Sequence, residues 1–483
     1  MSLFNKVFSG LKWTTAEAVI KAFIQVLRVF ILTKILSPTD FGIMALVMVV
    51  TGFSQIFIDF GISNAIIYKK DTSSNELSSL YWVNVFFGLV IFGIVFLLRD
   101  IFSDYIFNEP YLSDFLKYIS FVFILSGFTT QYNALLRKNL KFQSIAIINI
   151  ISNFVGFIVT LVLAYQGKGV YSLVVGYISL IIIKSILTIL FGLKYHIPHI
   201  YFKYSDIKFY LNFGGFQLSE RIVNYLRQNG DSILIGVFLT TETLGLYNVA
   251  KILVRKPIDL IQSIFGKMAF PVFTSIKSDK QLIKWAVTLN KIVFLAISPV
   301  MLLLIVFSES VIYYFYGLKW IAAAPFLKLL SILFALELLR TTFGPLLLSK
   351  GKAKLSFIFT LWYSFLVLAT LGVLLQYSII HALFGLIMVE LLVIQIMNFH
   401  FVMKPILNFS IKKYIQIILE VFTPLLVSCI ITSIGYYFFS NMILIYNNIL
   451  LYFLGLSVGA VIYYILNKEI VIFLKNKRNK IKK

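Results

Sequence analysis

The stretch Leu36–Gly42, which reads LSPTDFG, separates two long apolar segments near the N-terminus, and it decides the fold because the chain repeats it. Sliding the chain by 203 positions places this stretch on Leu239–Gly245, which reads LTTETLG. The same shift superimposes Glu17 on Glu220, a polar match within apolar surroundings. The segment before the first turn therefore corresponds to the segment before the second.

The composition places this repeat in a membrane. Hydrophobic residues make up 60% of the 483 positions and charged residues 13%, whereas soluble domains carry about 45–50% and about 25%. At about 20 residues per membrane-spanning helix, the apolar positions fill roughly fourteen spans and leave no room for a large soluble domain. The predicted helices are Thr14–Leu36, Phe41–Ile67, Leu77–Leu98, Phe115–Leu136, Ile145–Tyr165, Tyr171–Leu193, Phe209–Leu239, Gly245–Phe273, Trp285–Phe307, Ala324–Leu348, Leu355–Gln376, Ile379–Met403, Ile415–Phe439 and Ile449–Leu466.

The positions of Lys and Arg between these helices predict the orientation. Of the 43 basic residues, 26 lie in the even-numbered gaps and at the two ends, and 4 lie in the odd-numbered gaps. Because basic residues accumulate in cytoplasmic loops, this split supports fourteen helices and predicts that both termini are cytoplasmic. The same rule accounts for the basic tail, so we assign it no nucleic-acid partner.

The repeat and the helix count together predict an all-α polytopic membrane protein. Because six helices separate the two copies, both copies have the same orientation, as in transporters whose halves are related about an axis along the membrane normal. We expect an N-lobe of six helices over residues 1–200 and a C-lobe of six over residues 201–404. Two further helices follow over residues 405–468, and residues 469–483 form the basic cytoplasmic tail.

Charged residues inside the predicted spans are the candidate functional residues. A charge deep in a span costs about 2.5–3.5 kcal/mol on insertion scales, so these side chains line a wet interior or pair with acids. At 100° per residue, several of them fall on stripes along the first, seventh and eighth helices. The stripes hold Glu17, Lys21 and Arg28, then Glu220, Arg227 and Asp231, then Lys251 and Arg255, while Arg340 with Glu337 and Glu390 with Gln395 contribute from two later helices.

Two interpretations of these charges remain open. In the first, acid–base pairs such as Glu17 with Lys21 hold helices together. In the second, a water-filled cleft between the lobes keeps the bases ionised and binds phosphate or pyrophosphate, because Arg offers paired donors and Lys a compact charge. On the second interpretation, the substrate-binding residues are Lys21, Arg28, Arg227, Lys251, Arg255 and Arg340, and the residues for ion coupling or charge tuning are Glu17, Glu220 and Asp231.

The sequence shows no catalytic motif. It contains no phosphate-cradling glycine loop, no nucleophile elbow and no clustered metal ligands, so we expect a transporter without catalytic residues or cofactors. Transport would then be secondary, with coupling to a proton or sodium gradient, or would follow the gradient of the substrate. His196 and His199 flank Pro198 in a cytoplasmic loop, where we expect them to be solvated. The lone Cys429 lies in an apolar run, and we expect it to be packed as a small hydrophobic residue.

A family resemblance follows from the turns. Leu36–Gly42 and Asp59–Ile62 resemble motifs of the polysaccharide flippases in the multidrug/oligosaccharidyl-lipid/polysaccharide (MOP) exporter superfamily, of the O-antigen, colanic acid and lipopolysaccharide biosynthesis type. Asp231–Gly236, Leu244–Tyr247 and Phe270–Pro271 are similar to its second copy. The resemblance implies a V-shaped cavity, alternating access and the export of undecaprenyl-pyrophosphate-linked oligosaccharide across the bacterial cytoplasmic (inner) membrane for O-antigen, capsule or exopolysaccharide synthesis.

The resemblance also implies partners and leaves two alternatives. The partners are the lipid-linked oligosaccharide, membrane lipids, and the polymerase and other polysaccharide assembly proteins. A multidrug exporter, or an exporter of another lipid-linked substrate, belongs to the same superfamily, but a carrier of cationic drugs would expose acids rather than bases. A membrane polymerase or ligase would be an enzyme with a large outer loop, whereas the longest outer gap here is about sixteen residues.

Overall fold

The turn LSPTDFG starts a helix for local reasons. Helix α2 (Pro38–Asp59) begins at a capping box, in which the Ser37 hydroxyl accepts a hydrogen bond from the Asp40 backbone N–H at 3.2 Å. In return, Asp40 Oδ2 accepts a hydrogen bond from the Ser37 backbone N–H at 2.7 Å. Pro38 occupies the first helical turn, where its missing N–H costs nothing.

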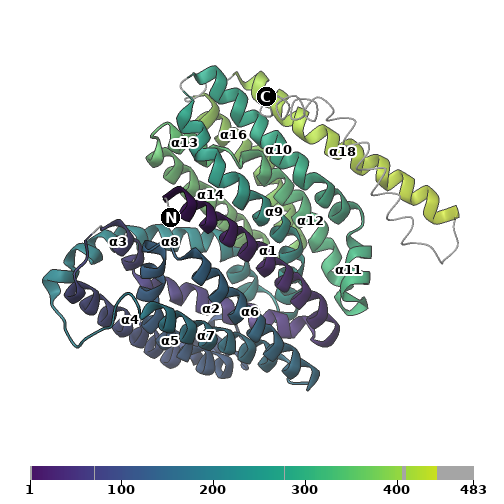
Figure 1. The fold of residues 1–483 in the computed structure, drawn as a ribbon. Helices are drawn as coiled ribbons and strands as arrows, with labels where there is room; N and C mark the ends of the chain where they lie inside the picture. The colour runs from purple at the N-terminus through teal and green to yellow at the C-terminus, as the bar shows by residue number, and fades with distance from the viewer. Residues whose placement is uncertain (1–2, 70, 277, 405–409, 443–483) are drawn as a thin grey trace. The chain divides into compact units, whose positions relative to one another are not determined.

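The computed structural model describes residues 3–69, 71–276, 278–404 and 410–442, and these residues form helices without any strand (Figure 1). In the first half these are α1 (Leu3–Ile35), α2, α3 (Ile62–Tyr68), α4 (Ser74–Asp100), α5 (Leu112–Lys138), α6 (Phe142–Tyr165), α7 (Val170–Gly192) and α8 (Tyr204–Phe238). In the second half these are α9 (Thr241–Ser275), α10 (Asp279–Val306), α11 (Ser308–Tyr316), α12 (Ala324–Glu337), α13 (Phe343–Ser349), α14 (Ala353–Leu374), α15 (Ile379–Met388), α16 (Gln395–Asn398) and α18 (Ile411–Met442). The predicted all-α class is confirmed.

Ten helical segments in the described part of the chain are long and apolar enough to cross a membrane. Helices α1, α8 and α9 have 33, 35 and 35 residues and are long enough too, but they carry the three charged stripes. Large apolar side chains such as Phe86, Leu97 and Phe365 are exposed, as the lipid-facing surface of a membrane protein requires. The total of fourteen stays a prediction, because Ile449–Leu466 and the tail 469–483 lie outside the described residues.

The predicted helix Phe41–Ile67 is in fact two helices. Phe60 and Gly61 take the left-handed conformation, with φ of 43° and 73°, which ends α2. Asp59 Oδ1 then accepts a hydrogen bond from the Ser63 backbone N–H at 2.9 Å, in the first turn of α3. The break lies against α8, since a Cβ added to Gly61 would lie 2.6 Å from the Cα of Gly214.

Two other predicted helices are continuous in path but irregular in winding. A 3₁₀ segment at Leu338–Arg340 separates α12 from α13, within the predicted helix Ala324–Leu348. π-helical segments at Val389–Ile394 and Phe399–Met403 interrupt the predicted helix Ile379–Met403. Such π segments appear frequently at functional sites, and the first of them carries Glu390.

The repeat at a shift of 203 positions is visible in the packing of the two turns. Helix α9 begins at Thr241 and α2 begins at Pro38, which are equivalent positions. A Cβ added to Gly42 would collide with the carbonyl oxygen of Thr241, and one added to Gly245 would collide with the carbonyl oxygen of Pro38. The shift of 203 positions turns Gly42 into Gly245 and Pro38 into Thr241, so it converts one contact into the other. A local pseudo-twofold axis therefore relates the two helix starts.

We expect Gly42→Ala and Gly245→Ala each to lower the free energy of unfolding by about 1–3 kcal/mol, because each methyl group would overlap a backbone carbonyl. Chemical unfolding in detergent measures this effect. Gly93→Ala in α4 is the matched control, because its added Cβ meets nothing within 4 Å and alanine favours the helix. Equal stability of all three variants would contradict the close packing.

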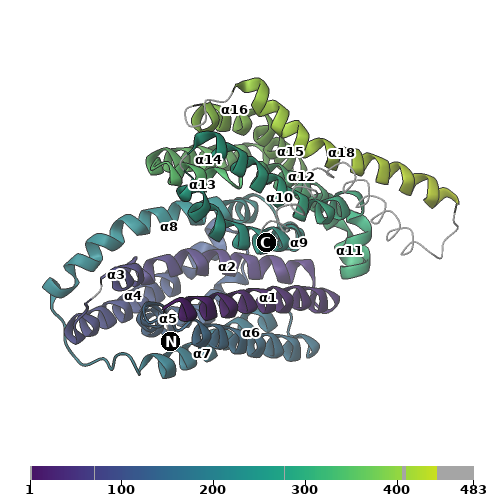
Figure 2. The ribbon, with the colours of Figure 1, turned by 45° about the horizontal axis from the view of Figure 1, so that its top comes forward.

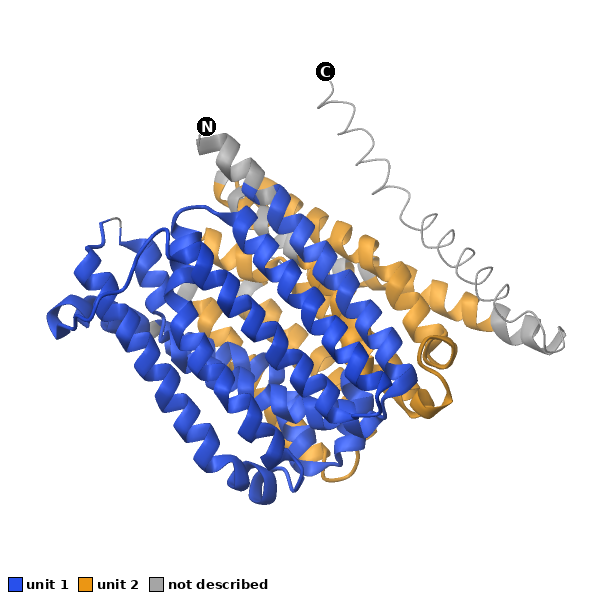
Figure 3. Cartoon of the chain, turned by 60° about the horizontal axis from the view of Figure 1, so that its bottom comes forward, with its two compact units in different colours: residues 1–248 blue, residues 249–483 orange. Residues whose placement is uncertain are grey.

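The chain divides into two compact units, residues 1–248 and residues 249–483 (Figure 3). In the first unit α4 pairs with α5 and α6 with α7, and α1 lies along α6 (Figures 1 and 2). Its core includes Tyr81, Tyr132 and Tyr210. In the described part of the second unit, α12 packs against α10 and α15, and α18 packs along α10. The lobe boundary predicted at residue 200 stays a prediction.

Candidate functional site: charged side chains within the helices

The first stripe begins with an ion pair on α1. Lys21 Nζ donates to Glu17 Oε1 at 2.6 Å, one helical turn away. Asn149 of α6 donates to the same oxygen at 2.8 Å. The pair therefore ties α1 to α6, which agrees with the interpretation that these charges hold helices together.

Arg28 lies two turns further along α1 in a different environment. Its guanidinium carbon is 5.9 Å from the centre of the Phe157 ring. Its Nε and Nη2 atoms are buried and form no hydrogen bond with any described residue. Since a buried donor without a partner costs about 1–3 kcal/mol or more when charged, Arg28 has donor capacity available for an anionic ligand.

The stripe on α8 separates into residues with different surroundings. Asp231 Oδ2 accepts a hydrogen bond from the Tyr247 hydroxyl at 2.6 Å, and its Oδ1 accepts one from the Ser232 backbone N–H at 2.7 Å. Asp231 thus connects α8 to the start of α9. Glu220 is exposed and Arg227 is half-buried, both on the same helix.

On α9, Lys251 and Arg255 are half-buried. Arg255 Nε donates to Asp259 Oδ1 at 3.0 Å, and its Nη1 lies 3.6 Å from Glu337 Oε2. The Arg255 guanidinium also lies over the Phe334 ring, at 5.3 Å. Arg255 is therefore bound by acids from its own helix and from α12.

Glu337 links Arg255 to the most deeply buried ion pair among the described residues, Arg340 with Glu390. Arg340 Nε donates to Glu390 Oε1 at 2.9 Å and Nη2 donates to Oε2 at 3.3 Å. The two side chains are 14% and 2% exposed. Tyr363 covers the guanidinium at 3.9 Å from its ring centre and donates to Glu337 at 2.9 Å. Arg340 lies on the 3₁₀ segment and Glu390 on the π segment, so both irregular segments meet at this pair.

The structure therefore sorts the predicted substrate-binding residues. Lys21, Arg255 and Arg340 are paired with acids, whereas Arg28 keeps unpaired donors within the described chain. Glu390 and Glu337, which the sequence indicated only as lesser contributors, are the acids that pair with Arg340 and Arg255. A lone acid in an apolar helix was the available signal for Glu390, but its partner on another helix could not be read from spacing.

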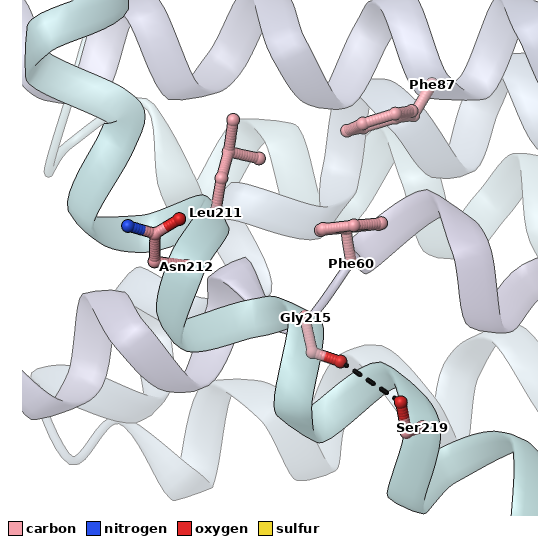
Figure 4. A pocket seen from close by; sticks show the side chains of 6 residues that line it. All are labelled: Phe60, Phe87, Leu211, Asn212, Gly215 and Ser219. Atoms are coloured by element: carbon pink, nitrogen blue, oxygen red, sulfur yellow. Dashed lines mark hydrogen bonds between the residues drawn. The ribbon is translucent and has the colours of Figure 1, made fainter.

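A groove lies beside the break between α2 and α3 (Figure 4). Its volume is about 560 Å³, and Phe60, Phe87 and Leu211 line it with Asn212, Gly215 and Ser219. The Phe60 and Phe87 rings stack at 5.4 Å. None of these lining residues is charged, so the groove does not share the chemistry of the stripes.

The described residues include no group of three or more His, Cys, Asp or Glu that could hold a metal ion.

The expectation that both loop histidines are solvated is wrong for His196, whereas His199 is exposed but hydrogen-bonded. His196 is only 6% exposed, and its Nε2 lies 3.2 Å from the Ser78 hydroxyl of α4. His199 Nδ1 lies 2.8 Å from the same hydroxyl, and its Nε2 lies 3.0 Å from Asn75 Oδ1. The loop between α7 and α8 is therefore docked on α4. Sequence spacing could not show this contact, because Ser78 is 118 positions from His196.

This docking should depend on pH. Burial, and secondarily the charge of His199, lower the pKa of His196 below its ordinary value. An undocked His196 keeps a pKa of about 6.5. Below that pH the undocked loop binds more protons than the docked loop, so docking weakens as pH falls. We expect faster hydrogen exchange over residues 194–203 at about pH 5.5 than at about pH 7.5, after correction for intrinsic rates. His196→Gln should reduce the difference, and an unchanged difference in that variant would contradict the assignment.

Comparison with solved structures identifies the fold. The fold is similar to that of the lipid II flippase MurJ in its inward closed conformation, with a TM-score of 0.76 over 97% of this chain and 99% of that chain at 14% identity. It is also similar to an inward-facing multidrug resistance MATE family transporter of the MOP superfamily, with a TM-score of 0.59 over 80% of this chain and 98% of that chain at 12% identity. The chain has the fold of the MOP superfamily of membrane transporters.

Sequence comparison defines the family. Residues 31–325 match the family described as polysaccharide biosynthesis protein, and the chain belongs to this family. It is 29% identical to the lipopolysaccharide biosynthesis protein WzxC of Escherichia coli (strain K12), over 86% of this chain and 84% of that protein. It is 30% identical to the teichuronic acid biosynthesis protein TuaB of Bacillus subtilis (strain 168), over 87% of each. The predicted family is confirmed, and these comparisons support the prediction of a multi-pass membrane transporter rather than an enzyme.

Proposed function

We propose that this protein is a flippase that moves undecaprenyl-pyrophosphate-linked oligosaccharide repeat units across the bacterial cytoplasmic membrane by alternating access. The product serves the synthesis of a surface polysaccharide, such as O-antigen, capsule or exopolysaccharide. Both termini face the cytoplasm, as the distribution of basic residues between the loops indicates. Membrane lipids surround the protein, and a polymerase and other polysaccharide assembly proteins use its product.

The single observation that carries this proposal is the state of Arg28, a cation within a helix. Its Nε and Nη2 atoms are buried and have no hydrogen-bond partner among the described residues. The chain that holds it belongs to a polysaccharide biosynthesis family. Guanidinium groups bind phosphate through paired, charge-assisted hydrogen bonds. In this proposal Arg28 and Arg227, both in the first unit, bind the pyrophosphate, and Lys251 stays a predicted substrate-binding residue. Lys21, Arg255 and Arg340 contribute positive charge while remaining paired with acids.

The proposed driving force is a proton or sodium gradient, since no nucleotide-binding loop occurs in the sequence. Glu220 is the strongest coupling residue of the three predicted acids, because it is exposed and forms no ion pair with a described residue. Glu17 and Asp231 are occupied by Lys21 and Tyr247, so their role is to tune the neighbouring groups.

The alternative of an exporter for cationic drugs has less support, because the intramembrane stripes carry more bases than acids.

Deletion of the gene tests the proposed flippase function. The proposed function requires that complete oligosaccharide repeat units accumulate on the lipid carrier at the cytoplasmic face and that the intact gene restores export. Accumulation of incomplete units would instead indicate a synthetic enzyme, and an unchanged pool would refute the flippase.

A further inference from the structure

A second cavity lies within the first unit, between α2, α5 and α7, and has a volume of about 150 Å³. That volume corresponds to about five water molecules, since a water occupies about 30 Å³ of liquid. Unlike the groove in Figure 4, this cavity has a mostly polar lining. Its polar residues are Gln55 on α2, Ser126, Thr129, Thr130 and Asn133 on α5, and Ser185 on α7, together with Lys184 on α7.

Lys184 is the only charged residue among those lining this cavity. It forms no hydrogen bond or ion pair with any residue that the structure describes. The charges that act on it are Lys21 and Arg137, which have the same sign, and Glu17, which has the opposite sign. Glu17 is already bound to Lys21 at 2.6 Å. The cavity therefore has a net positive potential that nothing within it neutralises.

The remaining lining groups suit a ligand rich in oxygen. The Thr129 and Thr130 hydroxyls donate to backbone carbonyls of their own helix, so their lone pairs are free to accept. Asn133 donates to the Thr129 carbonyl, which leaves its amide oxygen as an acceptor. The hydroxyls of Ser126 and Ser185 can donate. An anionic group would accept hydrogen bonds from the lining donors. Hydroxyls or bound water beside that group would donate hydrogen bonds to the lining acceptors.

We propose that this cavity binds an anionic group of the transported molecule, a phosphate or a sugar carboxylate, through the Lys184 ammonium. A phosphoryl group has about as many non-hydrogen atoms as the cavity has water positions, and a carboxylate is smaller. An unpaired ammonium in such surroundings is costly unless an anion or ordered water solvates it. The proposal rests on the proposed function, and it adds Lys184, a residue that the charged stripes do not include, to the binding residues.

The experiment measures the potential and the occupancy of the cavity without measuring transport. Cys429 is the chain's single cysteine, so Cys429→Ser provides a background in which Ser126→Cys reports on the cavity alone. The rates of its modification by an anionic and by a cationic methanethiosulfonate reagent are compared in full-length protein in lipid nanodiscs. Ser185→Cys serves as a second reporter if the first variant does not fold.

We expect the anionic reagent to react about tenfold faster than the cationic one, because the reporter shares the cavity with an ammonium group. Lys184→Gln should abolish most of that preference, and Lys184→Arg should keep it. Lys194→Gln is the matched control, since Lys194 is exposed just beyond the end of α7 and should leave the preference unchanged. Equal modification rates for the two reagents would overturn the proposal. It would also be overturned if Lys194→Gln lost as much of the preference for the anionic reagent as Lys184→Gln.

Protection of the reporter cysteine identifies the anion. Slower modification in the presence of pyrophosphate supports a phosphate ligand, and slower modification in the presence of glucuronate supports a sugar carboxylate. If neither compound protects the cysteine at millimolar concentration, the cavity does not bind the anion and the proposal is wrong. Export by the intact cell tests the proposed function separately, so a functional flippase with an unprotected cavity would overturn only this inference.

Discussion

Replacing Arg340 with methionine should lower the free energy of unfolding by about 3–5 kcal/mol, the cost typical of removing one partner of a buried ion pair. Glu390 is 2% exposed and receives two hydrogen bonds from Arg340, so the variant leaves an uncompensated carboxylate inside the protein. Glu337 also loses a nearby cation, at 3.7 Å. Chemical unfolding of purified protein in detergent measures the change.

A double variant separates the ion pair from simple loss of packing. Arg340→Met with Glu390→Gln removes both charges, and we expect it to be more stable than Arg340→Met alone, because the buried carboxylate is gone. Lys328→Met is the matched control, since Lys328 is exposed on α12 close to the same pair in sequence. If Arg340→Met proves as stable as that control, the pair does not hold these helices together.

Replacing Arg28 with alanine should abolish most export while leaving the protein folded in the membrane. Its buried Nε and Nη2 atoms bond to no described residue, so the substitution removes few interactions from the folded protein. Loss of a buried, charge-assisted contact with substrate costs about 2 kcal/mol or more, a fall of at least about 30-fold. Surface polysaccharide in a deletion strain that carries the variant measures export, and detergent unfolding measures stability.

Two further variants sharpen this test. Arg28→Lys keeps the positive charge but loses the paired donors, so we expect intermediate export. Lys34→Ala removes a cation from the exposed end of the same helix and should export normally. Normal export by Arg28→Ala would remove the main support for a phosphate-binding role at this position. A large loss of stability in Arg28→Ala would instead indicate that Arg28 is structural.

Most of the features that were predictable from sequence have local causes. The start of α2 follows from Ser37, Pro38 and Asp40, which are adjacent in sequence and form the cap by themselves. The charged stripes follow from helical spacing, and they fall on α1, α8 and α9 as expected. The repeat was also detectable, because Gly42 and Gly245 are needed at equivalent close contacts.

The features that escaped prediction depend on contacts between distant residues. The end of α2 at Phe60 and Gly61 packs against Gly214 of α8, about 150 positions away in the chain, so the glycine alone did not indicate the break. The pairing of Arg340 with Glu390 joins residues separated by 50 positions. Both residues lie on irregular helical segments, and hydrophobic periodicity does not reveal such segments. Spacing identified which side chains are charged, but only packing shows which of them are already neutralised.

Transfer of a lipid-linked oligosaccharide between leaflets of a reconstituted vesicle tests the central claim most directly. Purified protein is reconstituted into liposomes that carry a fluorescent undecaprenyl-pyrophosphate oligosaccharide, and a membrane-impermeant quencher reports the fraction in the outer leaflet. The proposed function predicts that an imposed proton or sodium gradient drives transfer by the wild type and by Lys34→Ala, and that Arg28→Ala is nearly inactive. Absence of transfer by the wild type under either gradient, or equal transfer by Arg28→Ala, would contradict it.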